Sequence, residues 1–254
     1  MDFTGKVAFV TGGSRGIGAA TVRAIVASGG RAVVHFGSNR AAAEALAEEV
    51  GTDKCRLIAA DLAVSGATRA LWTEALDWQG RIDALINNAG VFLAEDRTGS
   101  DDGWRDVWAR TLQINLISAA DLCRDAINHW LDAGVGGAIV NVSSRAAFRG
   151  DDQDHWSYAA SKGALVSLTK TLARAYSGKG IYSYGIAPGF VLTDMAQSAF
   201  DREPGLAEQL AKDIPRGAIA PASEVANAIC FFACGMATHA TGQTLDINGA
   251  SYVR

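Results

Sequence analysis

The chain has 254 residues, of which 49% are hydrophobic, and its formal net charge is −4. This length and hydrophobic content are sufficient for a large core within one α/β domain. The mild negative charge gives no basic face for nucleic acid, and no run of about 18 apolar residues predicts a membrane span. The N-terminal residues lack the basic and apolar regions of a signal peptide, so we expect a cytoplasmic protein. The four cysteines and four histidines are scattered, which predicts no metal site.

A glycine-rich loop follows the first predicted strand, at residues 6–10. The loop reads Thr-Gly-Gly-Ser-Arg-Gly-Ile-Gly from Thr11 to Gly18, and helix-compatible residues follow at 19–26. Between a strand and a helix, the backbone N–H groups of such a loop and the helix dipole bind a pyrophosphate. The spacing is G-x-x-x-G-x-G and not the G-x-G-x-x-G fingerprint. Taken alone, the loop is therefore equally compatible with a simple tight turn.

The second predicted strand, at residues 31–36, ends without an acidic residue. In a dinucleotide-binding fold an acidic side chain at this point binds the adenosine ribose hydroxyls, but residues 35–40 read His-Phe-Gly-Ser-Asn-Arg. Arg15 and Arg40 could both face a 2′-phosphate, because Arg pairs with phosphate in a bidentate manner. The alternative is that both are solvated surface residues. The pattern favours NADP(H) as the cofactor over NAD(H).

The middle of the chain continues the alternation of helices and strands. We expect helices at 41–50 and 67–78 and strands at 55–60 and 82–86. The strand at 82–86 leads into Asn-Asn-Ala-Gly at 87–90, where small residues allow the backbone to approach a cofactor closely. Residues 101–131 form a long helical region, for which we expect a break near Gly103. Asn115 falls in the buried part of that region, and a buried Asn needs hydrogen-bond partners.

A pair of serines and a Tyr–Lys pair follow the fifth predicted strand, at residues 138–142. Ser143 and Ser144 stand at its carboxyl end, the edge of an open parallel sheet where ligands bind. Tyr158 and Lys162 are one helical turn apart and share a face. An ammonium near a phenol lowers the pKa of the phenol, so Tyr158 could act as a general acid or base. Alone, the pair is also compatible with a packed Tyr and a solvated Lys.

The C-terminal part completes the sheet. We expect strands at 181–187 and 244–247 and a very apolar helix at 223–234, whose composition predicts burial between subunits. The segment near 190–215 is either a substrate lid or a fixed surface excursion. Strands that alternate with helices throughout predict an α/β fold with a doubly wound parallel sheet of about seven strands. Residues 1–254 should form a single domain.

Five motifs occur in an order and spacing that together resemble the short-chain dehydrogenase/reductase family. They are the loop from Thr11 to Gly18, Asn-Asn-Ala-Gly at 87–90, Asn115, Ser143-Ser144 and Tyr158-x-x-x-Lys162. The resemblance runs from about Phe3 to the C-terminus. It implies a Rossmann-like fold, a single dinucleotide-binding and catalytic domain, and a homotetramer or homodimer.

The resemblance also implies roles for four catalytic residues. Tyr158 exchanges a proton with the substrate, and Ser144 positions the substrate oxygen, with Ser143 as the alternative serine. Lys162 lowers the pKa of Tyr158 and binds the nicotinamide ribose. The helix around Asn115 is kinked and holds a water that links Lys162 to solvent.

The cofactor-binding residues that the resemblance implies lie in the loops at the carboxyl ends of the strands. They are Gly12, Ser14, Arg15, Gly16, Ile17, Gly18, Ser38, Asn39, Arg40, Asp61, Leu62, Asn88, Ala89, Gly90, Tyr158, Lys162, Pro188, Gly189, Val191 and Thr193. Asp61 either hydrogen-bonds the adenine or caps the next loop. Residues near Val191 and Thr193 hold the carboxamide and the pyrophosphate.

The implied reaction is hydride transfer between NADP(H) and a small-molecule carbonyl or secondary alcohol. A 3-oxoacyl thioester is the first candidate substrate, and a sugar, a steroid or a small alcohol is the alternative. We expect the substrate pocket to draw on residues 91–95, 146–156 and 190–214. An epimerase or dehydratase is disfavoured, because few residues follow Asn248. A non-catalytic NADP-binding regulator is the alternative of another class, although it would need no Ser, Tyr, Lys and Asn set.

Overall fold

The computed structural model describes residues 1–193 and 205–254, and these residues contain one large parallel sheet. Its strand order is β3-β2-β1-β4-β5-β6-β9. The strands are β1 (Val7–Val10), β2 (Arg31–Phe36), β3 (Cys55–Ala59), β4 (Ala84–Asn87), β5 (Gly137–Val142), β6 (Ile181–Pro188) and β9 (Thr244–Ile247). The order reverses between β1 and β4, and ligands bind at such a point in open α/β sheets. The predicted Rossmann-like, doubly wound sheet is confirmed.

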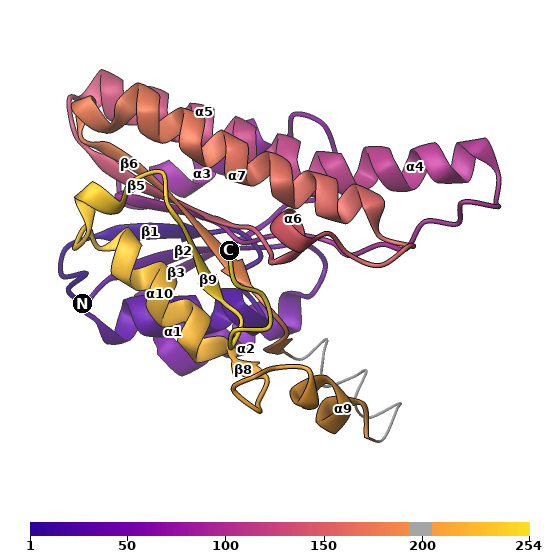
Figure 1. Ribbon diagram of the computed structural model, residues 1–254. Coiled ribbons are helices and arrows are strands. Elements are labelled where there is room, and N and C mark those ends of the chain that lie inside the picture. Colours follow the sequence, from indigo (N-terminus) through magenta and orange to yellow (C-terminus); the bar gives the residue numbers. More distant parts are fainter. Residues whose placement is uncertain (194–204) are drawn as a thin grey trace.

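Helices cover both faces of this sheet (Figure 1). One face carries α1 (Gly16–Ala27), α2 (Arg40–Val50) and α10 (Ala222–Ala233). The other face carries α3 (Ala67–Asp77), α5 (Ser118–Ala133) and α7 (Trp156–Tyr176). The shorter or peripheral elements are α4 (Asp101–Leu112), η1 (Gln113–Ile117), α6 (Ala146–Arg149), η2 (Ser177–Lys179), β7 (Val191–Leu192), α9 (Leu206–Lys212), β8 (Ala220–Pro221) and η3 (Thr238–Ala240).

The core consists of two apolar layers, one on each side of the sheet. Along β1, Ala8 and Val10 join the layer beneath α1 and α10, whereas Val7 and Phe9 join the layer beneath α3 and α5. Strands buried on both faces are continuous apolar runs in the sequence. This explains why the central strands could be located from the sequence; the edge strands β3 and β9, which were also predicted, are only partly buried.

The expected helix break near Gly103 is wrong. Gly103 lies in the first turn of α4, where its N–H donates to the Ser100 hydroxyl at 3.1 Å, and this contact caps the helix. The irregular stretch is instead the π-helical segment η1, which contains Asn115. Such single-turn π-segments within α-helices frequently occur at functional sites.

Two further expectations concern the C-terminal part. The apolar side chains of α10, including Val225, Ile229 and Phe232, are buried within the chain, where α10 packs against α1. The apolar character of this helix therefore has an explanation without a second subunit. The segment proposed as a lid falls partly on residues 194–204, which lie outside the described residues.

Within the described part of the chain, no helix has both the length and the apolar character needed to cross a membrane.

Candidate active site

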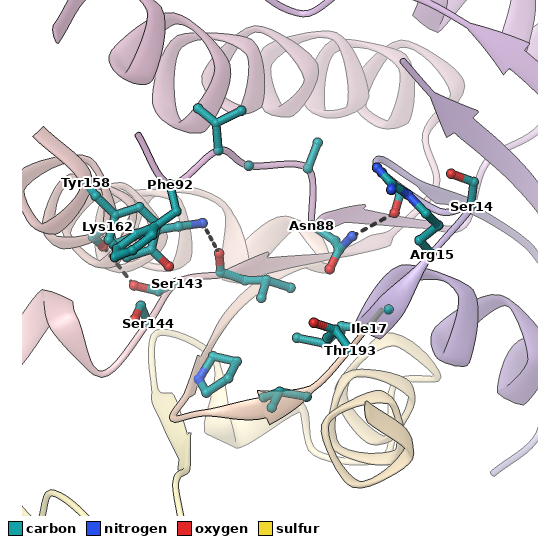
Figure 2. A pocket seen from close by; sticks show the side chains of 18 of the residues that line it. Ser14, Arg15, Ile17, Asn88, Phe92, Ser143, Ser144, Tyr158, Lys162 and Thr193 are labelled. Atoms are coloured by element: carbon teal, nitrogen blue, oxygen red, sulfur yellow. Dashed lines mark hydrogen bonds between the residues drawn. The ribbon is translucent and has the colours of Figure 1, made fainter. Parts of the chain in front are cut away.

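A pocket of about 390 Å³ opens where the strand order reverses, between the loops that follow β1, β4, β5 and β6. It brings together most of the predicted site residues. Its lining consists of Gly12, Ser14, Arg15, Gly16, Ile17, Phe36, Gly37, Asn88, Ala89, Gly90, Val91, Phe92, Val142, Ser143, Ser144, Tyr158, Lys162, Pro188, Gly189, Val191 and Thr193. Figure 2 shows Ser14 and Arg15 at one end of the pocket and Ser144, Tyr158 and Lys162 at the other.

The glycine loop is closed so tightly that side chains are excluded at two positions. A Cβ on Gly18 would lie 2.2 Å from the carbonyl oxygen of Gly12. Gly12 itself has a φ of +60°, and a Cβ there would lie 3.0 Å from the Cα of Ala89. The loop leads into α1, whose first turn contains no acidic residue and receives no side-chain cap. This uncapped, positive helix end at the pocket fits the pyrophosphate of a dinucleotide.

Asn88 joins the glycine loop to the loop after β4. Its side-chain amide donates to the carbonyl oxygens of Thr11 and Gly12, both at 3.0 Å. In return, the Thr11 hydroxyl accepts the backbone N–H groups of Asn88 and Ala89, each at 3.0 Å. The two predicted motifs therefore form one hydrogen-bonded unit at the floor of the pocket.

His35 holds the same loop from the second strand. Its ring Nδ1 lies 3.1 Å from the backbone nitrogen of Gly12, and its Nε2 lies 3.0 Å from the carbonyl oxygen of Ala60. Gly12 N–H can only donate, so Nδ1 accepts and Nε2 carries the proton. Burial lowers the pKa of His35, which is consistent with this neutral ring. This role of His35 is not apparent from the sequence, because a lone His in an apolar strand gives no signal of its partners.

The end of the pocket that contains Tyr158 and Lys162 is built by α7 and by the exit of β5. The ammonium of Lys162 is buried, donates to the carbonyl oxygen of Val142 at 2.9 Å and lies 5.8 Å from the centre of the Tyr158 ring. Burial lowers the pKa of Lys162 to about 8. This ammonium therefore titrates in the range in which enzymes work.

The protonation of Tyr158 differs from the expectation. Burial raises the pKa of Tyr158, a hydrogen bond with Ser144 partly offsets this, and the charge of Asp151 raises the pKa further. The predicted lowering by Lys162 is not seen, because desolvation of the phenol is the largest influence. Tyr158 is thus held in its protonated, proton-donating form.

The two serines have different partners. The hydroxyl of Ser143 donates to the backbone carbonyl of Lys162 at 2.8 Å and is buried. The Ser144 hydroxyl accepts the N–H of Ala146 at 3.1 Å and lies close enough to Tyr158 to offset part of the rise in its pKa. Of the two, Ser144 therefore has the contact with the Tyr side chain.

Asn115 lies behind the pocket and does not line it. Its amide oxygen accepts the N–H of Val91 at 2.8 Å, and its amide nitrogen donates to the Val91 carbonyl at 3.0 Å and to the Ser161 hydroxyl at 3.1 Å. A Cβ on Gly90 would lie 3.3 Å both from the Asn115 Oδ1 and from the Lys162 Nζ. Asn115 and Lys162 thus approach the same point from two sides.

Several predicted cofactor residues lie outside the pocket lining. They are Gly18, Ser38, Asn39, Arg40, Asp61 and Leu62. Asn39 caps α2 by accepting the N–H of Ala42, and Arg40 pairs with Glu44 at 3.6 Å. Asp61 accepts the N–H of Ala63 at 2.9 Å, which matches the alternative reading as a loop cap, and Leu62 is buried in the core.

Phe92 forms part of the wall beside Tyr158, within the segment 91–95 that was expected to contribute to the substrate pocket. Its ring meets the Tyr158 ring edge-on, with 4.7 Å between the ring centres, and stacks on the His155 ring, with 3.6 Å between the centres. Phe36, Gly37 and Val142 also line the pocket but were not predicted. Their only signal in the sequence is their position at strand ends.

Comparisons with known proteins agree with this geometry. The family model described as short chain dehydrogenase matches residues 6–204. The 3-oxoacyl-(acyl-carrier-protein) reductase FabG of Escherichia coli K12 is 31% identical, over 100% of both chains. The D-threitol dehydrogenase of Mycolicibacterium smegmatis is 38% identical, over 98% of this chain and 94% of the relative. The 3beta-hydroxysteroid dehydrogenase 1 of Eggerthella lenta is 34% identical with the same coverage.

A solved structure shows the same fold over the whole chain. A crystal structure described as a gluconate dehydrogenase from Agrobacterium tumefaciens superposes with a TM-score of 0.88 and 25% sequence identity, and it covers 100% of this chain and 98% of its own. The family match, the full-length relatives and the shared fold lead to one conclusion: the chain belongs to the short-chain dehydrogenase family.

Proposed function

We propose that this protein is an NADP(H)-dependent oxidoreductase that transfers hydride between the nicotinamide and a carbonyl or secondary alcohol. The observation that carries the proposal is the convergence of Ser144, Tyr158 and Lys162 at one end of the pocket. The uncapped end of α1 lies at the same pocket, which suits the phosphates of the cofactor.

The protein residues have separate tasks in the reduction direction. The bound nicotinamide supplies the hydride. Tyr158 donates its proton to the oxygen of the substrate carbonyl, and Ser144 holds that oxygen by a hydrogen bond. Lys162, when protonated, stabilises the negative charge that Tyr158 acquires. Asn115 fixes the backbone at Val91 and hydrogen-bonds the Ser161 hydroxyl, which keeps the wall beside Lys162 in place.

The choice of NADP(H) rests on the charge at the end of β2. No acidic side chain is available there to bind ribose hydroxyls, and the pocket lining at this end contains Phe36, Gly37 and Arg15. Within the described residues, Arg15 makes no ion pair, so its guanidinium is available for a 2′-phosphate.

The substrate is a small molecule with one reducible carbonyl. A 3-oxoacyl thioester is the first candidate, because full-length relatives carry the name of that activity. A sugar alcohol or a steroid is the alternative, since the names of two other full-length relatives refer to these substrates.

We also propose a homodimer or homotetramer. β9 is an edge strand of the sheet, and Leu245 on it and Phe231 on α10 remain exposed. Exposed apolar side chains beside an open strand edge are suited to contact with a second copy. Light scattering coupled to size exclusion should give a multiple of the 26.5 kDa chain mass.

The test of the main proposal is NADPH oxidation with a panel of 3-oxoacyl thioesters, sugar-derived ketones and steroid ketones. NADH is measured alongside, and Tyr158→Phe serves as the inactive control. Turnover that requires NADPH and is lost in Tyr158→Phe is the expected result. Tight NADPH binding without turnover on any substrate would favour the non-catalytic regulator, and full activity of Tyr158→Phe would contradict the mechanism.

A further inference from the structure

Glu95 is a buried carboxylate beside the start of helix α7. It lies in the loop between β4 and α4 and is 3% exposed. It makes no ion pair with any residue that the structure describes. A charge in such a position is costly unless several hydrogen bonds satisfy it. Its partners therefore indicate what the residue does.

The partners of Glu95 are the first amides of α7, the helix that bears Tyr158 and Lys162. One carboxylate oxygen accepts the N–H of Trp156 at 2.6 Å, and the other accepts the N–H of Ser157 at 2.7 Å. The backbone N–H of Glu95 also donates to the carbonyl of Asp154 at 2.8 Å. These three bonds join two loops that are about sixty residues apart in the chain, a separation that no local capping motif spans.

Helix α7 has no cap of its own. His155 at the N-cap position makes no side-chain capping bond, and the first turn contains no acidic residue. The first N–H groups of a helix need acceptors, and a negative charge at that end is favourable to the helix dipole. Glu95 fulfils both requirements from another part of the chain.

The same contact places the wall of the pocket beside the reacting group. Phe92 is three residues before Glu95 and packs edge-on against Tyr158, while its other contact is the stack on His155. The loop that Glu95 fastens to α7 is therefore the loop that presents Phe92 to the Tyr158 ring (Figure 2). Tyr158 lies one residue after Ser157, so any shift of the helix end moves its hydroxyl directly.

We propose that Glu95 is a positioning residue of the active site: its carboxylate clamps the start of α7 and thereby fixes Tyr158 relative to Phe92 and Ser144. The proposal rests on the proposed oxidoreductase function, because it concerns the placement of the proton donor. Displacement of a reacting group by about 1 Å can reduce the rate 10²-fold.

The experiment compares Glu95→Gln with Asp96→Asn. Glu95→Gln keeps the size of the side chain but turns an NH₂ group toward one of the two helix N–H donors, so only one bond can remain. Asp96 is the next residue in the loop, is exposed and accepts hydrogen bonds from Thr98 within the same loop, which makes Asp96→Asn the matched control. We expect kcat to fall about 10- to 100-fold in Glu95→Gln, with KM and the Kd for NADPH changed less than about threefold. Asp96→Asn should behave as wild type.

Hydrogen exchange supplies a readout that does not need turnover. The amides of Trp156 and Ser157 should exchange faster in Glu95→Gln than in wild type or Asp96→Asn. Unchanged exchange would overturn the clamp, and faster exchange with unchanged kcat would overturn the positioning role. If wild type shows no turnover, or Tyr158→Phe keeps it, the proposed function fails instead, and exchange still decides whether the clamp exists. Glu95→Asp, which is too short to reach both amides, should resemble Glu95→Gln and serves if the latter does not fold.

Discussion

The hydroxyl of Ser143 donates to the backbone carbonyl of Lys162 at 2.8 Å, and both residues are buried. This bond ties the exit of β5 to the middle of α7, two elements that meet at the pocket. It also occupies the Ser143 hydroxyl in a structural contact. The Ser144 hydroxyl, by contrast, lowers the pKa of Tyr158 and so offsets part of the effect of burial. The pair therefore divides into one serine that supports the site and one that faces it.

Replacement of each serine by alanine should separate these two roles. In Ser144→Ala we expect kcat to fall about 10²-fold, the typical effect of losing one hydrogen-bond donor to a reacting oxygen, with little change in stability. In Ser143→Ala the unfolding free energy should fall by about 2 kcal/mol, because the Lys162 carbonyl loses its buried partner. Steady-state kinetics and urea unfolding measure the two effects. If kcat fell more in Ser143→Ala than in Ser144→Ala, the catalytic role would belong to Ser143.

The stability of the protein should rise with pH between about 8 and 10.5 because of Lys162. Burial lowers its pKa from 10.5 to about 8, so in this range the unfolded chain binds more protons than the folded chain. From pH 7.5 to 9.5 this group should add about 2 kcal/mol to the unfolding free energy. Urea unfolding of wild type and Lys162→Met at both pH values gives the difference. Equal pH slopes in the two proteins would contradict a depressed pKa.

His35→Leu should weaken cofactor binding without touching the catalytic residues. The change removes the acceptor of the Gly12 N–H and the partner of the Ala60 carbonyl. Each loss leaves a partly buried polar group without its protein partner, at about 1 kcal/mol of unfolding free energy. Calorimetric titration should show a higher Kd for NADPH, and exposed His239→Asn is the control.

The same histidine has a second, pH-dependent signature. The pKa of His35 in the folded chain lies below 6.5, so as the pH falls this residue is protonated in the unfolded chain before it is protonated in the folded chain. The contribution of His35 to stability is therefore complete above pH 6.5 and declines as the pH falls below it. The unfolding free energy of His35→Leu should lack this decline. If it fell with decreasing pH as steeply as that of wild type, His35 would not be the cause of the decline.

Arg15→Ala should change cofactor preference more than Arg40→Ala. Arg15 lines the pocket, whereas Arg40 pairs with Glu44 and lies over the Phe36 ring at 5.5 Å, outside the lining. We expect kcat/KM for NADPH to fall at least about 10-fold in Arg15→Ala, the order of one charge-assisted phosphate contact, while the value for NADH stays constant. Arg56→Ala is the control, because Arg56 is an exposed residue on the edge strand β3 and pairs with Glu74. If kcat/KM fell equally with NADPH and NADH, Arg15 would not be the residue that binds the 2′-phosphate.

The predictable part of the structure was the part encoded in local patterns. Apolar runs predicted where the strands lie. The order of the motifs predicted that Gly12, Asn88, Tyr158 and Lys162 belong to one site, and all four line the pocket. The partners of polar side chains were not predictable, because they depend on elements distant in sequence. Nothing near Glu95 indicates that it reaches α7. The irregular helical backbone is at η1, around Asn115, where the resemblance implied a kink, and not at Gly103.

The predicted direction of the pKa shift at Tyr158 was wrong for the same reason. The i,i+4 spacing places an ammonium on the same helix face, but it does not reveal how deeply the surrounding loops bury the phenol. Burial is a property of the assembled fold, and here it is the largest influence on the pKa of the phenol.

The pairing of β9 with β6 and the packing of α10 on α1 also determine how the chain can fold during synthesis. The apolar stripe of α1 leaves the ribosome early, whereas its cover is translated only near residues 222–233. Until then, the growing chain carries an uncovered helix face and an unpaired edge on β6. Such nascent chains are aggregation-prone and are the kind that chaperones retain. Translation slowed before residue 222 should therefore reduce the soluble yield, whereas the mature protein would be unaffected.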